Sequence, residues 1–177
     1  MFWIILAVVI VQRLGELAIA KKNERWMKKQ GAYEVGADHY PQIVLLHIVF
    51  FLSLIIEAGF HGFLLEEGWI FPLGIFILAQ FVRVWSLRSL GDYWNTKIIV
   101  LPGSDVVIKG PYRFIRHPNY LVVAVEILTL PLMFQAFFTA VFFTMLNAWI
   151  LLKIRIPAEE KALAEMTSNY KKTFLKE

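Results

Sequence analysis

The sequence contains no cysteine, which excludes disulfide bridges and thiolate metal sites and leaves the redox compartment unreadable. It also lacks a glycine-rich phosphate loop, an HExxH zinc motif and a nucleophilic serine elbow. No spacing of His, Asp and Glu predicts a metal cluster, so we expect no metal. The basic segments are short and adjoin apolar runs, which argues against a nucleic-acid partner.

Apolar residues dominate what is present. The chain has 177 residues, of which 58% are hydrophobic and 15% aromatic, whereas soluble domains are nearer half apolar. Five apolar runs approach the roughly 17–25 residues that cross a bilayer, and they cover about 2–20, 41–60, 69–87, 120–134 and 136–154. The fourth run is short and ends near Pro131, so we expect the last two to form a tight helical hairpin. The prediction is a single all-α integral membrane domain over residues 1–177.

Lys and Arg alternate between the connections. They occur in the first connection, in the third, and from the end of the last run onward, whereas the second connection, 61–68, has none and carries Glu66 and Glu67. The turn near Gln135 has none either. Cytoplasmic loops carry an excess of Lys and Arg, so we expect the N-terminus outside and the C-terminus in the cytoplasm.

Several charged residues fall inside the apolar runs. A charge at the centre of a bilayer costs roughly 2.5–3.5 kcal/mol on insertion scales, so such groups face inward and pair. Arg13 and Glu16 are three residues apart and can pair on one helix face. Glu126 either faces a cavity or pairs with Arg83.

The most distinctive stretch is 110–120, which reads Gly-Pro-Tyr-Arg-Phe-Ile-Arg-His-Pro-Asn-Tyr. Pro118 suits the first turn of a helix, which places His117 at the cap. The free N–H groups of a helix start, together with Arg113 and Arg116, would stabilise a carboxylate or phosphate. The alternative is that Arg and Tyr only anchor the helix at the membrane interface.

Two further segments lie on the same predicted side. Residues 98–101 and 106–108 are apolar and flank a Pro-Gly-Ser-Asp turn, which predicts a small hairpin or a loop pressed on the membrane surface. Pro157 suits a helix start, and apolar residues then recur at spacings of three and four, as in an amphipathic helix lying on the membrane. The recurring residues are Leu163, Met166, Tyr170 and Phe174.

Arg155 and Glu159 stand four residues apart at the end of the last apolar run. An Arg can hold a carboxylate or another anionic oxygen with two donors, and Glu159 can accept from hydroxyl or ammonium groups. The alternative is a solvated pair on one helix, which contributes only a few tenths of a kcal/mol.

The motif Gly110-x-Tyr112, Arg116-His117-Pro118-x-Tyr120, followed by Arg155-Ile156-x-x-Glu159-Glu160-x-x-Leu163, resembles the isoprenylcysteine carboxyl methyltransferase family. The resemblance covers about 97–170. The N-terminal part is similar to a small bacterial branch that is associated with methylating long-chain alkylpyrones or related polyketide phenolics. The motifs that carry this similarity are Arg13-Leu14-x-Glu16, Asn23-x-x-Trp26, Gly31-Ala32-x-Glu34 and His39-Tyr40-Pro41. The resemblance implies S-adenosylmethionine as cofactor and a multi-pass protein of the bacterial cytoplasmic membrane.

The resemblance also implies residue roles. A cytoplasmic pocket would be formed by the loop before the fourth helix and by the C-terminal helix, within about 94–170. Arg155 would be the catalytic residue that contacts the acceptor. Apart from the resemblance, Glu126 is a further candidate for binding the acceptor. The implied cofactor-binding residues are Lys97, Ser104, Asp105, Val106, Val107, Tyr112, His117, Pro118, Asn119, Tyr120 and Glu159.

The acceptor is the least determined part of this hypothesis. Ser104 and Lys97 stand where the eukaryotic enzymes have His and Gln, which weakens the case for prenylated cysteine. The expected reaction is methylation of a carboxylate or acidic hydroxyl on a lipophilic acceptor, which can be alkylpyrone-like, alkylphenol-like or prenylcysteine-like. We expect the lipid bilayer and this acceptor as partners, and no obligate protein partner. The alternatives are an NADPH-dependent membrane reductase of related architecture and a membrane protein without enzymatic activity.

Overall fold

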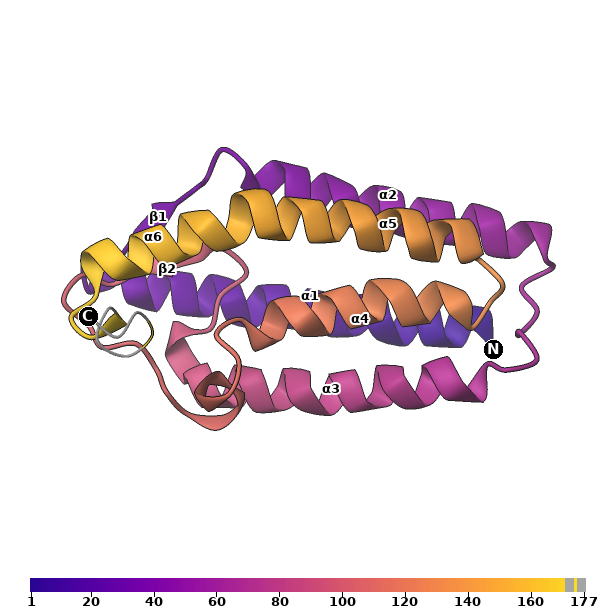
Figure 1. Ribbon diagram of the computed structural model, residues 1–177, viewed down its shortest axis with the longest axis horizontal. Helices are drawn as coiled ribbons and strands as arrows, with labels where there is room; N and C mark the ends of the chain where they lie inside the picture. Colours follow the sequence, from indigo (N-terminus) through magenta and orange to yellow (C-terminus); the bar gives the residue numbers. More distant parts are fainter. Residues whose placement is uncertain (171–173, 175–177) are drawn as a thin grey trace.

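The structure is a computed structural model that describes residues 1–170 and 174. Its long helices run side by side along one axis (Figure 1). The helices are α1 (Phe2–Lys29), α2 (Tyr40–Phe60), α3 (Ile70–Leu90), α4 (Pro118–Leu132), α5 (Phe137–Ile150) and α6 (Ile156–Met166). Two short strands, β1 (Tyr33–Val35) and β2 (Ile98–Val100), pair antiparallel. Short 3-10 turns cover Gly91–Tyr93 and Gly110–Arg113, and a π-helical turn covers Leu151–Arg155.

Four helical segments are long and apolar enough to cross a membrane: α1, α2, α3 with the turn after it, and α5 continued through α6. The fifth, α4, has 15 residues, which span about 22 Å at a rise of 1.5 Å per residue. This length is less than the roughly 30 Å of a hydrocarbon core. Each predicted apolar run thus corresponds to a helix. However, α1 continues well past residue 20 to Lys29, because apolar composition marks the membrane span and not the whole helix.

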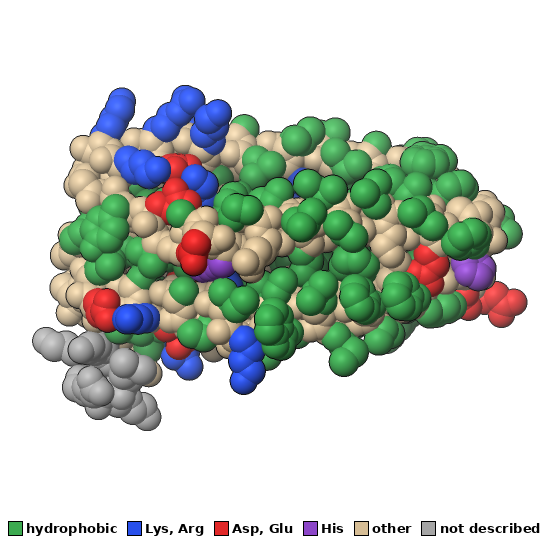
Figure 2. Space-filling view, turned by 90° about the horizontal axis from the view of Figure 1, so that it is seen from above, with side chains coloured by type: hydrophobic (Ala, Val, Ile, Leu, Met, Phe, Trp, Pro, Cys, Tyr) green, Lys and Arg blue, Asp and Glu red, His purple; other side chains and the backbone are tan. Residues whose placement is uncertain are grey.

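The connections gather at opposite ends of the bundle. The segments between α1 and α2 and between α3 and α4 lie at the same end as α6, and the N-terminus lies at the other end (Figure 1). Most Lys and Arg side chains in view lie at the first end, together with acidic ones, whereas the other end shows acidic and His side chains and no Lys or Arg in this view (Figure 2). Successive connections thus alternate between the two ends of the bundle, as the positions of Lys and Arg predict.

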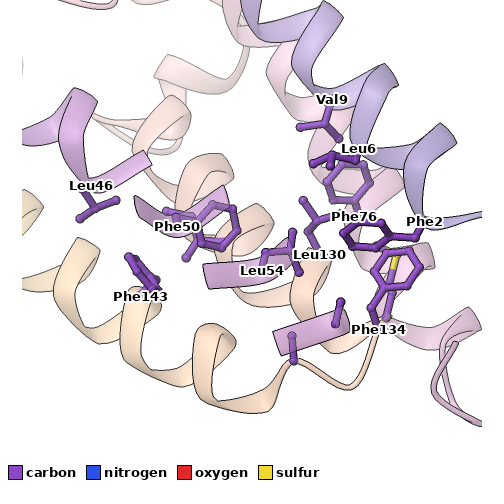
Figure 3. Close-up of a cluster of buried hydrophobic side chains, with 14 of the residues drawn as sticks. Phe2, Leu6, Val9, Leu46, Phe50, Leu54, Phe76, Leu130, Phe134 and Phe143 are labelled. Atoms are coloured by element: carbon purple, nitrogen blue, oxygen red, sulfur yellow. The ribbon is translucent and has the colours of Figure 1, made fainter. Parts of the chain in front are cut away.

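The largest hydrophobic core lies between the helices in the half of the bundle nearer the N-terminus. Phe2 packs edge to face on Phe134, with ring centroids 4.9 Å apart. Figure 3 shows these rings with side chains from α1, α2, α3, α4 and α5 around them. Leu54 and Ala58 of α2 are completely buried there. This packing fixes the helices relative to one another.

A charged cluster joins α1, α3 and α4 inside the bundle. Glu126 accepts hydrogen bonds from Arg83, Arg13 and Gln80. Arg13 and Arg83 also reach Glu16, at 3.0 and 2.7 Å. The predicted pairing of Arg13 with Glu16 is confirmed, and the open question about Glu126 is answered by its pairing with Arg83. Two positive and two negative charges thus compensate one another away from water.

The predicted hairpin between 98–101 and 106–108 is wrong. β2 pairs instead with β1, with Val35 opposite Ile98 and Tyr33 opposite Val100. A buried, β-branched strand needs a partner, and the segment after the first helix supplies it across a long sequence separation. The loop after β2 consequently stays irregular and is free to contact the end of the chain.

The predicted amphipathic helix is present, and its apolar face packs on protein. α6 follows α5 through the π-helical turn as one continuous rod. Pro157 has no N–H for the helical bond to the carbonyl four residues earlier, and the wide turn lies where that bond is missing. The apolar face of α6, with Ala162, Leu163 and Met166, packs on β2 and β1. The sheet therefore covers the face that we assigned to lipid. Of the remaining tail, 171–173 and 175–177 lie outside the described residues.

Candidate functional site

The loop before α4 is fixed against α3 by a glycine. Gly110 has a φ of +55°, a conformation that side chains rarely allow. A Cβ atom at this position would lie only 2.0 Å from the Oγ atom of Ser89. Only glycine therefore permits this approach. The loop then enters α4 at Pro118, with His117 as the N-cap residue, as predicted.

The first turn of α4 uses most of its own N–H groups. The N–H groups of Tyr120 and Leu121 both donate to the His117 carbonyl, at 3.2 and 3.4 Å. Pro118 has no N–H to offer. Among the described residues, the backbone N–H of Asn119 is the one N–H in this turn that has no acceptor. The expected row of free N–H groups is thus reduced to one, and side chains supply most of the polar contacts here.

Two carboxylates of α6 meet the start of α4. Glu160 Oε1 lies 3.1 Å from His117 Nε2 and 2.9 Å from an Nη atom of Arg116. Glu159 accepts a short hydrogen bond from the Tyr120 hydroxyl. The His117 ring stacks on the Tyr120 ring, with centroids 5.4 Å apart. The structure therefore brings together two motifs that are separated by about 40 residues in the sequence.

Arg155 lies beside this group and is only 3% exposed. Its Nε donates to the Tyr120 hydroxyl at 3.1 Å, and its Nη2 donates to the Thr96 carbonyl at 2.8 Å. Its Nη1 is buried and has no hydrogen-bond partner in the part of the chain that the structure describes. The alternative of a solvated Arg155–Glu159 pair is excluded by this burial. The Tyr120 hydroxyl instead connects the two residues, which we call the Arg155–Tyr120–Glu159 chain.

An unmet buried donor on a charged group is costly. Leaving a buried hydrogen-bonding group without a partner costs about 1–3 kcal/mol, and more for a charged group. Asn119 adds a second unmet group, since its Oδ1 is buried without a partner among the described residues. The Nη1 donor of Arg155 and the Oδ1 acceptor of Asn119 thus have no partner among the described residues. Buried groups of this kind are usually hydrogen-bonded, and a polar ligand would supply the missing partners.

Tyr112 completes the polar surroundings as a neutral group. Its side chain is half-buried in the turn before α4. Burial, and secondarily the charge of Glu159, raise the pKa of the Tyr112 phenol above its ordinary value. It therefore keeps its proton at neutral pH and can still donate a hydrogen bond.

The loop after β2 is held by the segment that follows α6. The Ser104 carbonyl accepts from the Ser168 N–H at 3.2 Å, and Asp105 accepts from the Ser168 hydroxyl at 2.5 Å. The Val106 N–H donates to Asn169 Oδ1 at 2.8 Å. The four residues of this loop to which the resemblance assigns cofactor contacts are Ser104, Asp105, Val106 and the half-buried Val107. The first three of them are thus held by Ser168 and Asn169.

Two of the proposed site residues have other partners. The Lys97 ammonium lies 3.2 Å from Glu24 and 3.0 Å from Glu34, and the hydrogen bond to Glu34 is the main cause of its raised pKa. Glu126 belongs to the charged cluster inside the bundle, where Arg and Gln side chains occupy its carboxylate. Among the described residues, neither side chain has a hydrogen bond to Arg155.

Sequence reasoning missed two contributors to this site. Thr96 contributes through its backbone carbonyl, and residue type carries no signal for such a contact. Glu160 was visible beside Glu159 but was given no role, although an acid pair on the first turn of a helix can reach two neighbouring basic groups. In the described part of the chain, no group of three or more His, Asp and Glu could hold a metal ion.

Comparisons with known proteins give one family match and several relatives. A model of the isoprenylcysteine carboxyl methyltransferase (ICMT) family matches residues 72–165. The uncharacterized protein YpbQ of Bacillus subtilis is 50% identical over 93% of this chain and 98% of its own length. An uncharacterized protein of Haemophilus influenzae is 26% identical over 90% of this chain and 93% of its own.

One relative has a named activity. The protein-S-isoprenylcysteine O-methyltransferase of Tribolium castaneum is 26% identical over 71% of this chain, which corresponds to 46% of that protein. No solved structure matches this chain. The family match covers more than half of the chain and includes α4, α5 and nearly all of α3 and α6. The chain therefore belongs to the isoprenylcysteine carboxyl methyltransferase family.

Proposed function

We propose that the protein uses S-adenosylmethionine to methylate a carboxylate or acidic hydroxyl on a lipophilic acceptor. Membership of the family supports the coarser statement, a multi-pass membrane methyltransferase. One observation carries the finer proposal. Arg155 is buried, has an unmet donor, and is joined through Tyr120 to Glu159. A single chain of contacts thus connects the group proposed for the acceptor with a group proposed for the cofactor.

The residues around α4 fit the polar groups of this cofactor. When bound, the cofactor supplies a methyl group on a positively charged sulfur. The unmet Oδ1 of Asn119 suits its ammonium or amine groups, and the Asn119 N–H suits its carboxylate. Glu159 can accept from its hydroxyls. The residues that would hold it are Lys97, Ser104, Asp105, Val106, Val107, Tyr112, His117, Pro118, Asn119, Tyr120 and Glu159.

Arg155 would hold the oxygen of the acceptor through its unmet Nη1. A carboxylate or an acidic hydroxyl is already largely anionic near neutral pH, so the protein has little proton transfer to perform. Its main contribution is alignment, which supplies roughly 7–11 kcal/mol when two reactants are held in position. The fixed bonds of Arg155 to Tyr120 and Thr96 keep the guanidinium in one orientation. With only one guanidinium nitrogen left without a partner, Arg155 also avoids binding the ground-state anion too tightly.

The membrane fold suits an acceptor with a long alkyl tail. Arg155 stands at the end of α5, where the apolar helix meets the polar end of the bundle. The tail would stay in lipid while its head group reaches Arg155, with Glu126 deeper in the same bundle as a further proposed contact. Each buried methylene contributes about 0.8 kcal/mol. We place this polar end in the cytoplasm of a bacterial cell, with the N-terminus outside and the whole chain as one domain.

Calorimetric titration in detergent tests the cofactor. We expect S-adenosylhomocysteine to bind and NADPH not to bind. A Glu159→Gln variant should bind more weakly, whereas Glu165→Gln, an exposed position on the same helix, should bind as the unaltered protein does. Binding of NADPH without S-adenosylhomocysteine would favour a reductase, and binding of neither would favour a protein without enzymatic activity.

A further inference from the structure

A surface hollow of about 420 Å³ lies on α1, away from the site around α4. Four of its lining side chains are positively charged and none is negative. The lining residues are Ala18, Lys21, Lys22, Arg25, Trp26 and Lys29. We call this surface the α1 basic hollow.

The α1 basic hollow faces away from the protein. The buried residues in this part of the helix are Ala20, Asn23 and Met27. At 3.6 residues per turn, the four basic residues fall on the opposite side of the helix. All four are exposed. Their charges are therefore directed at whatever surrounds the bundle.

The same face of α1 is apolar nearer the N-terminus. Val11 and Leu14 lie on this side and are exposed, as lipid-facing residues are. The stretch from residue 2 to residue 20 spans about 27 Å, which is close to the roughly 30 Å of a hydrocarbon core. Ala18 stands at the boundary, and Lys21 to Lys29 extend about 12 Å further. The basic residues therefore lie at the depth of the lipid head groups.

The charges of the α1 basic hollow are not neutralised by the protein. Lys28, on the flank of the helix, pairs with Glu24 at 2.5 Å. In contrast, no ion pair with a described residue is found for the four basic residues of the hollow. Trp26 borders them, 38% exposed and edge to face with Tyr93 at 5.7 Å. Trp is enriched at the level of lipid head groups.

We propose that the α1 basic hollow binds the phosphate of an anionic phospholipid. Four uncompensated positive charges select a negative head group over a zwitterionic one. Continuity with the lipid-facing side of α1 favours a membrane lipid over a soluble phosphate, because the acyl chains then lie along Val11 and Leu14. The bound lipid would hold the end of α1 at a fixed depth.

Native mass spectrometry of the full-length protein from neutral detergent tests this assignment. The measured quantity is the fraction of protein that retains added phosphatidylglycerol or phosphatidylcholine. Each basic residue near an anionic surface contributes about fivefold in affinity, so the variant Lys21→Gln with Arg25→Gln should retain phosphatidylglycerol roughly 30-fold more weakly. The control, Lys109→Gln with Lys161→Gln, removes the same charge from exposed positions elsewhere.

Three outcomes would overturn the proposal. One is equal retention of phosphatidylglycerol and phosphatidylcholine by the unaltered protein. Another is an equal loss of retention in the Lys21/Arg25 variant and in the control. A third is displacement of the lipid by millimolar inorganic phosphate, which would identify a general anion site. Preferential phosphatidylglycerol retention that only the Lys21/Arg25 variant loses, and that phosphate leaves unchanged, supports it.

Discussion

Replacing Tyr120 by Phe removes one oxygen atom from the centre of the Arg155–Tyr120–Glu159 chain. The hydroxyl accepts from Arg155 Nε at 3.1 Å and donates to Glu159. Its loss leaves Nε as well as Nη1 of Arg155 without a partner, on a residue that is 3% exposed. One hydrogen bond to a charged group is worth about 1.5–3 kcal/mol. If that energy is lost in the transition state, kcat/KM falls roughly 10- to 150-fold.

The assay is methyl transfer from S-adenosylmethionine to the acceptor, measured beside the affinity for S-adenosylhomocysteine. We expect Tyr120→Phe to lower kcat/KM in this range and to weaken cofactor binding as well, because both neighbours of the hydroxyl lose their orientation. Tyr33→Phe is the matched control, since this exposed Tyr makes no side-chain hydrogen bond with a described residue. A kcat/KM within twofold of the unaltered protein would refute the role of the hydroxyl.

Five further substitutions test the separate parts of the proposed site and fold. Arg155→Ala should abolish transfer while leaving S-adenosylhomocysteine affinity nearly intact, and an equal loss of both in calorimetry would contradict an acceptor role. Glu159→Ala and His117→Ala should each weaken cofactor binding about tenfold, whereas unchanged affinity would remove the altered residue from the site. Gly110→Ala should lower the thermal midpoint in detergent by an amount equivalent to about 1–3 kcal/mol, because its Cβ would overlap a serine of α3; an unchanged midpoint would show that the loop can move. Glu126→Gln should destabilise the bundle by about 3–5 kcal/mol, because it leaves a buried arginine of α3 partly uncompensated; an equally stable variant would show that the cluster does not hold the helices together.

The helices could be predicted from the sequence because apolar runs mark them directly. The start of α4 was equally predictable, because Pro118 is tolerated in the first turn of a helix but destabilises a helix interior. The C-terminal end of α1 could not be predicted, because residues 21–29 continue the helix with mostly charged and polar side chains. β2 was recognisable as extended, but α2 and α3 lie between it and its partner β1 in the sequence. Local pattern does not reveal pairing over such a distance.

The contacts among the candidate site residues could not be predicted from the sequence. Arg155 and Glu159 suggested a direct pair by their spacing, whereas the structure connects them through the hydroxyl of Tyr120. Sequence spacing on one helix cannot show which group of another helix will intervene. Glu126 illustrates the same limit, because its pairing with Arg83 depends on the contact between α3 and α4.

Transfer of a labelled methyl group tests the central proposal most directly. Purified protein would be incubated with labelled S-adenosylmethionine and a lipid extract of its host, and labelled products would be identified by mass. We predict a labelled lipophilic ester or ether that the unaltered protein forms and that Arg155→Ala does not form. The absence of any labelled lipid, with protein that is folded and binds S-adenosylhomocysteine, would contradict the proposed activity.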